Sequence, residues 1–277
     1  DKMSPLLLES APLAYREAKR LCRGCDWYHG LWQYLRILGA VLPPSRQNDF
    51  YHSAITPLAQ SGKYPRVCIS GSADYGMLDV LLAIWQPFGG VPEITVVDHC
   101  QTPLFLNQWY ADHVGVKINT VCEDMTAYRC ESGFDVICTH SFFGNFDLAQ
   151  REALIKNWHS LLRTGGKIVT ANRIRPVVFQ RLGFSEQQTA DFIETVLRAR
   201  QDMPERVLPE SELAEAARSY GRNYGTYPVT STAYIDDLFC RHGFAFDLFE
   251  VTGRQQKMSG PPSTPGKAIR LKVVATK

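Results

Sequence analysis

Short apolar runs alternate with amphipathic segments over residues 65–172. The runs are four to six residues long and rich in Val and Ile, and they comprise Val67–Ser70, Ile94–Asp98, Lys117–Cys122, Phe134–Thr139 and Lys167–Ala171. Strands that are apolar on both sides are typical of parallel sheets covered by helices on both faces. Five such strand–helix units in series predict a doubly wound α/β sheet.

The segments between the runs carry recognisable helix ends. Thr102-Pro103 is expected to cap and open a helix through Trp109. Asp147 with Gln150 resembles a capping box, and Gly165 is expected to close the helix that follows.

Two flanking regions interrupt this alternation. In residues 1–60, apolar side chains recur every three or four residues from Trp27 to Val41, which predicts a helix stopped by Pro43-Pro44 and an N-terminal helical cap. Residues 173–228 are rich in Arg and Tyr and look helical, with a start at Ser185. An insert that follows the fifth strand is expected to cover the ligand crevice of the 61–277 domain.

The C-terminal region predicts a helix over Ser231–His242, a strand over Phe244–Val251, a polar loop over Gly253–Gly266 and a strand over Ala268–Thr276. Too little chain joins the two strands for a crossover helix, so they should be antiparallel. The prediction is a seven-stranded sheet with an antiparallel last strand.

Composition narrows the choice of partners and location. Across 277 residues the net charge is +2, 45% of residues are hydrophobic and 21% are charged, so nothing requires nucleic acid or a membrane. No apolar stretch approaches the ~20 residues of a membrane span, and no signal peptide opens the chain. We therefore expect a cytoplasmic protein without a nucleic-acid or membrane partner, and the sequence leaves a homo-oligomer open.

The eight cysteines include one CxxC pair, Cys22 and Cys25. A structural zinc site usually draws its four ligands from two close pairs, and there is no second CxxC. The sequence therefore favours reduced thiols, with no metal site and no disulfide.

Ligands of open parallel sheets bind beyond the carboxyl ends of the strands, and four of these ends carry suggestive residues. They are Gly71-Ser72-Ala73, Asp98-His99, Glu123-Asp124-Met125 and the stretch His140–Asn145. Small residues let a backbone approach a ligand, and an ionised acid accepts hydrogen bonds from ribose hydroxyls or an exocyclic amine.

A dinucleotide site is the competing interpretation. Gly71-x-Ala73-x-x-Gly76 fits the loose dinucleotide fingerprint, with an acid further along. Two features count against it. An NAD site has no role for an acid at the third strand end, and the antiparallel last strand is foreign to the standard dinucleotide-binding sheet.

In their order, these pieces resemble the class I S-adenosylmethionine-dependent methyltransferases over 65–172 and 231–277. RVCISGSADYG resembles the family's glycine loop, ITVVDH its ribose-binding acid, CEDM its adenine-binding acid and CTHSFFGNF its fourth motif. LLRTGGKIV and IDDLFCRHGFAFDLFEV resemble its later elements. The loop departs from the family where Ile69 replaces an acid, and Ser70 is expected to substitute for it.

The resemblance implies S-adenosylmethionine as cofactor. The residues that it assigns to cofactor binding are Ser70, Gly71, Ser72, Ala73, Asp98, His99, Asp124, Met125, His140 and Ser141. His140, beside the reacting centre, is the candidate general base, although contact with the cofactor or simple packing is the alternative. Tyr28, Phe142 and Phe143 are the candidate substrate contacts.

Methyl transfer is an in-line displacement that depends on orientation and exclusion of water. We expect an enzyme acting on a small-molecule acceptor, since an aromatic and Arg-rich cap suits a small molecule with an acidic group. The alternatives are an NAD-dependent oxidoreductase, a methyltransferase acting on a macromolecule, and a non-catalytic cofactor-binding protein of the same fold.

Overall fold

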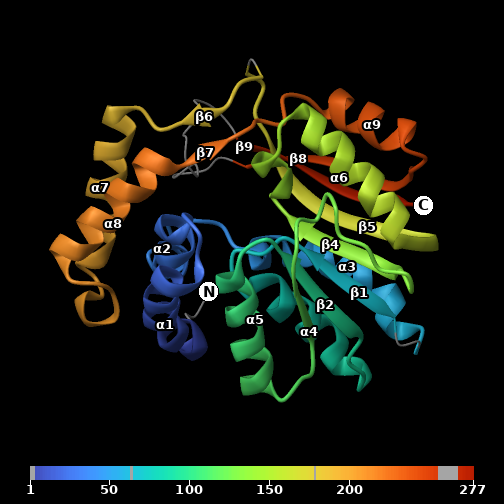
Figure 1. Cartoon of the computed structure of the whole chain (residues 1–277), viewed down its shortest axis with the longest axis horizontal. Helices are drawn as coiled ribbons and strands as arrows, with labels where there is room; N and C mark the ends of the chain where they lie inside the picture. Colours follow the sequence, from blue (N-terminus) through green and yellow to red (C-terminus); the bar gives the residue numbers. More distant parts are fainter. Residues whose placement is uncertain (1–3, 63–64, 178, 255–267) are drawn as a thin grey trace.

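A seven-stranded sheet forms the centre of the molecule (Figure 1). The computed structural model describes residues 4–62, 65–177, 179–254 and 268–277. The strand order is β3-β2-β1-β4-β5-β9-β8, and only β9 runs antiparallel to its neighbours. This confirms the predicted doubly wound sheet with an antiparallel last strand. The loop predicted over 253–266 lies almost wholly outside the described residues.

The strands of this sheet agree with the predicted strands to within three residues at each end, except that β5 begins at Leu162, five residues before the predicted start at Lys167. They are β1 (Arg66–Ser70), β2 (Glu93–Asp98), β3 (Asn119–Cys122), β4 (Phe134–His140), β5 (Leu162–Ile174), β8 (Ala245–Arg254) and β9 (Ala268–Thr276). The register places Ser70 beside Val97 and His140 beside Ala171, so the carboxyl ends of the central strands meet at one edge.

Helices cover both faces of the sheet. One face carries α3 (Asn48–Gln60), α4 (Gly76–Trp85) and α5 (Gln101–Val114), and the other carries α6 (Leu148–Leu161) and α9 (Thr232–Arg241) (Figure 1). Each face has its own apolar core, in which side chains such as Leu78 and Trp158 are fully buried. The capping box of Asp147 and Gln150 is present at the start of α6.

Three predicted helix ends differ from the observed ones. The helix predicted through Val41 is α2 (Asp26–Ile37), which ends earlier because Gly39 takes a left-handed φ of 68°. Thr102 lies inside α5, whose N-cap is Cys100. Gly165 does not close α6, which ends at Leu161; it forms a turn within β5 with φ 75°.

The third strand differs from its predicted environment. β3 is the edge strand, and Asn119, Thr120 and Cys122 are exposed rather than buried on both faces. An apolar run of this length does not distinguish a central strand from an edge strand, because the neighbours that bury it lie elsewhere in the sequence.

Two distant parts of the chain build the cap. They are the helices α1 (Pro5–Leu21) and α2, and the 173–228 insert with α7 (Glu186–Arg200), α8 (Glu210–Asn223) and the short strands β6 (Leu182–Gly183) and β7 (Gly225–Thr226). Leu31 and Leu35 of α2 share an apolar core with Phe192 of α7 and Leu213 and Tyr220 of α8. The N-terminal helices and the insert are therefore packed together, on the left of Figure 1.

A buried arginine anchors the end of the insert. Arg151 of α6 is 0% exposed and donates hydrogen bonds to the carbonyls of Phe143 (3.1 Å), Tyr227 (2.8 Å) and Pro228 (3.2 Å). A guanidinium has five donors in a fixed fork, so a single side chain can satisfy several carbonyls of two different loops.

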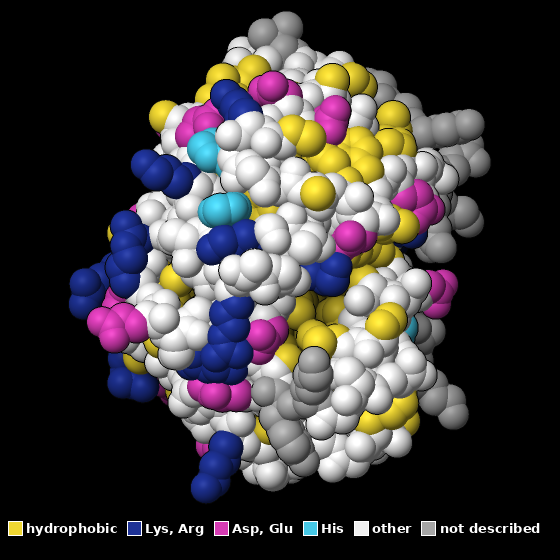
Figure 2. Space-filling view, turned by 90° about the vertical axis from the view of Figure 1, so that its right-hand side faces the viewer, with side chains coloured by type: hydrophobic (Ala, Val, Ile, Leu, Met, Phe, Trp, Pro, Cys, Tyr) yellow, Lys and Arg dark blue, Asp and Glu magenta, His cyan; other side chains and the backbone are white. Residues whose placement is uncertain are grey.

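The face turned away from the cap is mixed in character. Lys and Arg side chains gather on the left of that view among Asp and Glu, and hydrophobic side chains gather on its right (Figure 2). Among the described residues, no helix has the length and apolar character that crossing a membrane requires.

Candidate functional site

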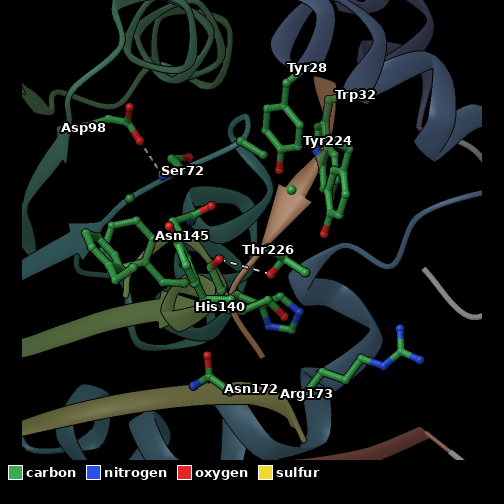
Figure 3. A pocket seen from close by; sticks show the side chains of 18 of the residues that line it. Tyr28, Trp32, Ser72, Asp98, His140, Asn145, Asn172, Arg173, Tyr224 and Thr226 are labelled. Carbon is green, nitrogen blue, oxygen red and sulfur yellow. Dashed lines mark hydrogen bonds between the residues drawn. The ribbon is translucent and has the colours of Figure 1, made fainter. Parts of the chain in front are cut away.

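A cavity of about 570 Å³ lies beyond the carboxyl ends of β1, β2, β4 and β5, and residues of α2 and α8 form part of its wall (Figure 3). This volume is in the range of pockets that hold a drug-sized ligand. Its lining falls into two parts, one rich in loop backbone and acids and the other in aromatic and arginine side chains.

The loop after β1 forms the floor of the first part. Gly71 has a φ of 71°, and its N–H donates to the carbonyl of Val97 at 2.9 Å. A Cβ at this position would come within 2.0 Å of the Phe142 ring, so only glycine lets the two loops approach each other here. Ser72 and Ala73 follow and line the cavity.

Asp98 closes the strand end next to this loop. Its Oδ2 accepts from the N–H of Ser72 at 2.9 Å, shown in Figure 3, and its Oδ1 accepts from the N–H of Cys100 at 2.8 Å. Burial raises the pKa of Asp98, while His29 and the two N–H groups oppose that rise. A carboxylate has about four acceptor sites, so Asp98 retains lone pairs for a ligand. His99 lies beside it with its side chain 76% exposed.

The loop after β3 brings a second acid to the cavity. Oδ1 of Asp124 accepts from both the N–H and the hydroxyl of Thr126 at 2.8 Å, an arrangement that leaves Oδ2 for a ligand. Met125 is 3% exposed and lines the cavity beside it.

The loop after β4 is strained. Ser141 has a φ of 53° and is the one non-glycine residue with positive φ among the described residues. Its N–H donates to the carbonyl of Ala171 at 2.8 Å, which holds the turn. Unusual backbone of this kind concentrates at ligand and active sites. Phe142 follows, its ring stacked near Trp158 and facing the cavity.

His140 joins the two parts of the cavity. The Tyr51 hydroxyl donates to the carbonyl of Thr139 at 3.0 Å and lies 2.9 Å from Nδ1 of His140. Because the single hydroxyl hydrogen goes to the carbonyl, Nδ1 carries the hydrogen in the second contact and Nε2 keeps its lone pair. Nε2 is buried and has no hydrogen-bond partner among the described residues. Burial, and then Arg270, lowers the pKa of His140 to about 3, so the ring is neutral.

Aromatic side chains from the cap form one wall of the second part. Tyr28 of α2 stacks with Tyr220 of α8 at 6.0 Å, and Tyr220 stacks with Tyr224, the C-cap of α8, at 5.5 Å. Tyr28, Trp32 and Tyr224 are seen together in Figure 3. Nε1 of Trp32 is buried without a hydrogen-bond partner within the described part of the chain. The wall thus presents aromatic ring faces to the cavity.

Arginines also line this part of the cavity. Arg173 and Arg175 extend from the end of β5, Arg270 comes from β9, and Arg181 from the insert. Burial, then Arg175 and Arg270, lowers the pKa of Arg173 to about 10. The positive charges of these arginines repel one another, and an anion bound among them would offset that repulsion.

Two predicted site residues do not line the cavity. Ser70 is 0% exposed, and its Oγ accepts from Nε1 of Trp158 at 3.0 Å, so it belongs to the core under the sheet end. Phe143 is 1% exposed and packs against Trp158 and Phe239. Neighbouring residues of the turn point in opposite directions, so Phe142 reaches the cavity and Phe143 the core. Neither Ser70 nor Phe143 is therefore placed to contact a ligand in the cavity.

The other predicted residues all line the cavity. They are Tyr28, Gly71, Ser72, Ala73, Asp98, His99, Asp124, Met125, His140, Ser141 and Phe142. The sequence argument did not single out Tyr51 or Asn172, and it favoured a core position for Trp32, which lines the cavity. Asn172 follows the fifth apolar run by one residue, so the rule that found the other strand ends could have found it; Tyr51 had no such signal.

A cluster of potential metal ligands adjoins the cavity. Cys22, Cys25, His29 and Cys100 offer ligand atoms that all lie within 4.8 Å of one another. The expectation of no metal site rested on the lack of a second CxxC. In the structure, His29 of α2 and Cys100, the N-cap of α5, lie beside the single CxxC pair.

No family model and no curated protein matches the chain by sequence. Among solved structures, the pyocyanin biosynthetic protein PhzM matches with a TM-score of 0.51 and 16% identity, over 95% of this chain and 61% of PhzM. Magnesium protoporphyrin IX methyltransferase (ChlM) from Synechocystis PCC 6803, crystallised with bound SAH, matches with a TM-score of 0.50 and 13% identity, over 91% of this chain and 96% of ChlM. At such identities the likeness is one of fold.

Proposed function

We propose that this chain, which has the class I S-adenosylmethionine-dependent methyltransferase fold, is itself such an enzyme and methylates a hydroxyl group of a small acidic molecule. The observation that carries the proposal is the division of one cavity into an acid-and-backbone part and an aromatic-and-arginine part. The first part suits an adenosyl cofactor, the second suits an anionic acceptor, and His140 lies between them.

The residues of the first part fit the cofactor. Asp98 keeps lone pairs for the two ribose hydroxyls, and hydroxyl donors would favour the ionised form of a carboxyl whose pKa is raised by burial. Asp124 can accept from the exocyclic amine of adenine, and the thioether of Met125 suits the face of a purine. These are the assignments that the family resemblance implies for the same positions.

When bound, the cofactor supplies an electrophilic methyl group on a sulfonium. The protein must align the acceptor oxygen with that group and exclude water. The cap formed by α2 and α8 encloses the strand ends for this purpose, and its rings give a rigid wall against which an acceptor can be held.

His140 suits a hydroxyl acceptor better than an amine. Its Nε2 lone pair can accept the hydroxyl hydrogen and orient the oxygen before transfer. With a pKa of about 3, the imidazole of His140 is a weak base. It therefore takes the hydroxyl proton late in the reaction, when the new bond to the methyl group has made the acceptor oxygen strongly acidic. An amine acceptor attacks through its own lone pair and needs no base during the transfer, so the Nε2 lone pair has a role only for a hydroxyl acceptor. We therefore favour O-methylation.

The charged wall indicates an acidic group on the acceptor. Arg173, Arg175 and Arg270 all line the cavity, and the charges of Arg175 and Arg270 contribute to the lowered pKa of Arg173. A carboxylate or phosphate there would offset this repulsion and accept charge-assisted hydrogen bonds. The acceptor class proposed is an aromatic hydroxy acid.

Calorimetric titration with S-adenosylmethionine, S-adenosylhomocysteine and NAD tests the cofactor. We expect binding of the first two, and saturable binding of NAD alone would contradict the proposal. Transfer of a labelled methyl group is then measured to a panel of aromatic hydroxy acids, to their neutral methyl esters and to matched amines. Preference for the acids supports the proposal, whereas label that enters only total RNA or protein supports the macromolecular alternative.

A further inference from the structure

Three thiols and one imidazole converge from three separate elements at the edge of the cap. Cys100 lies 3.5 Å from Cys22 and 3.5 Å from Cys25, measured between Sγ atoms, and Sγ of Cys22 lies 3.5 Å from Nδ1 of His29. Cys100 and His29 are 4% and 5% exposed, so the centre of the cluster is shielded from solvent.

These separations resemble the edges of a zinc tetrahedron. Bonds of about 2.3 Å to sulfur and about 2.0–2.1 Å to nitrogen place two sulfurs about 3.8 Å apart and a sulfur and a nitrogen about 3.5 Å apart. The three closest contacts are within a few tenths of an ångström of those edges, and the wider pairs can close by side-chain rotation.

The local sequence builds this geometry. Cys22 follows α1 and Cys25 is the N-cap of α2, and Gly24 between them has a φ of 99°, a left-handed conformation that glycine adopts without strain. This tight turn aims both thiols to one side. His29 follows Cys25 by four residues, which places it on the same helix face one turn further on.

The fourth ligand comes from the sheet. Cys100 is the N-cap of α5, two residues after Asp98. The Thr102 hydroxyl lies 3.0 Å from Sγ of Cys22, where it can donate to a thiolate, as outer hydrogen bonds do at metal sites. The cluster therefore has a complete ligand set and a supporting donor.

We propose that Cys22, Cys25, His29 and Cys100 bind one structural Zn²⁺. Three thiolates and an imidazole form one of the ordinary structural zinc sets, and with four protein ligands no position stays open for a substrate. A disulfide could join only two of the three thiols, and its sulfurs would lie about 2.05 Å apart rather than 3.5 Å.

The ion would tie the cap to the loop that holds Asp98. The N–H of Cys100 donates to Oδ1 of Asp98 at 2.8 Å, so a metal that fixes Cys100 also fixes the carboxylate. On the other side, Cys25 and His29 fix the start of α2, which carries Tyr28 and Trp32 into the cavity wall. The zinc site does not depend on the proposed methyl transfer, because it stands on the ligand set alone.

Metal content tests the proposal directly. The full chain, purified without a histidine tag from zinc-supplemented medium, should contain about one zinc per chain by plasma mass spectrometry. Cys22→Ser and Cys100→Ser should lose it, while the matched controls Cys240→Ser and His52→Asn should keep it. Substoichiometric zinc in the wild-type chain, iron in its place, or equal loss in the controls would overturn the proposal.

Because serine variants can fail to fold, a second measurement uses the wild-type chain. After removal of metal by a chelator under reducing conditions, added Co²⁺ should produce the visible and near-ultraviolet bands of tetrahedral thiolate coordination, and Zn²⁺ should abolish them in stoichiometric amount. Metal removal should also lower the Tm, and zinc should restore it. A colourless cobalt titration, or a disulfide between any two of the three cysteines in the native chain, would refute the site.

Discussion

The Tyr51 hydroxyl lies 2.9 Å from Nδ1 of His140, and it donates its own hydrogen to the carbonyl of Thr139 at 3.0 Å. This pair fixes both the tautomer and the orientation of the imidazole. Tyr51 belongs to α3 and is fully buried, so the ring at the end of β4 is held by a residue from the N-terminal region.

Tyr51→Phe should therefore slow the reaction without preventing cofactor binding. Without the acceptor at Nδ1, the imidazole is free to place its hydrogen on either nitrogen, and we expect kcat to fall about tenfold, the value of one hydrogen bond. His140→Gln should lower kcat about a hundredfold. Single-turnover rates and calorimetric Kd values for S-adenosylmethionine separate the two effects. If both variants lost kcat and affinity together, a purely structural role would be indicated.

The buried imidazole should also leave a signature in stability. Burial lowers the pKa of His140 to about 3, whereas an unfolded histidine titrates near ~6.5. Between these values the unfolded chain binds a proton that the folded chain does not, so the free energy of unfolding falls with falling pH by up to about 1.4 kcal/mol per pH unit. Urea unfolding measured across that window should show a shallower slope for His140→Gln than for the wild type. Identical slopes would mean that His140 titrates normally.

Asp98→Asn should weaken cofactor binding. The amide offers an N–H where the carboxylate accepts from Ser72 or Cys100, and it loses the charge that favours hydroxyl donors. Loss of charge-assisted bonds predicts a rise in Kd for S-adenosylmethionine of about 10–100-fold. Asp202→Asn, on the exposed surface, is the matched control. An unchanged Kd in the Asp98 variant, with the fold intact, would show that the acid has another role.

Tyr220 links the N-terminal helices to the insert through its ring. It is 1% exposed and stacks with Tyr28, Tyr224 and Phe192. Tyr220→Ala should lower the free energy of unfolding by about 3–5 kcal/mol, as for other buried aromatic truncations. Phe88 is 41% exposed, so Phe88→Ala should lower the free energy of unfolding far less. Comparable losses from urea unfolding of the two variants would argue against a shared cap core.

Arg151→Lys tests the anchor at the end of the insert. A lysine keeps the charge but cannot reach the carbonyls of Phe143, Tyr227 and Pro228 together. We expect a loss of about 2–4 kcal/mol in the free energy of unfolding, because buried carbonyls lose their donors. Arg218→Lys, on the exposed face of α8, should be neutral by the same measurement.

Local patterns predicted the sheet well because they depend on neighbouring residues. The strand end at Asp98 and the capping box of Asp147 and Gln150 are short-range signals, and both appear in the structure where the sequence placed them. β4 ends at His140, one residue beyond the predicted end at Thr139. The strand over 117–122 was assigned the wrong environment, since burial at an edge depends on strand order.

Most of the site features that the sequence did not predict depend on contacts between residues far apart in the chain. Nothing near His140 identifies Tyr51, which is 89 residues away. Similarly, Cys22 and Cys100 are 78 residues apart, so a search for paired cysteines along the chain finds only half of the cluster. Phe142 and Phe143 are adjacent and chemically equal, and only the conformation of the turn decides which one reaches the cavity.

The position of β9 between β5 and β8 has a consequence for biosynthesis. Lys167 pairs with Thr276, so the edge strand β8 is joined to the rest of the sheet by residues that leave the ribosome long after β5. Until then, β5 exposes an unpaired strand edge and β8 has no sheet to join. A nascent chain that stalls before Ala268 would therefore display the open edge of a five-stranded sheet and one unpaired strand, and we would expect chaperones to engage it at that stage.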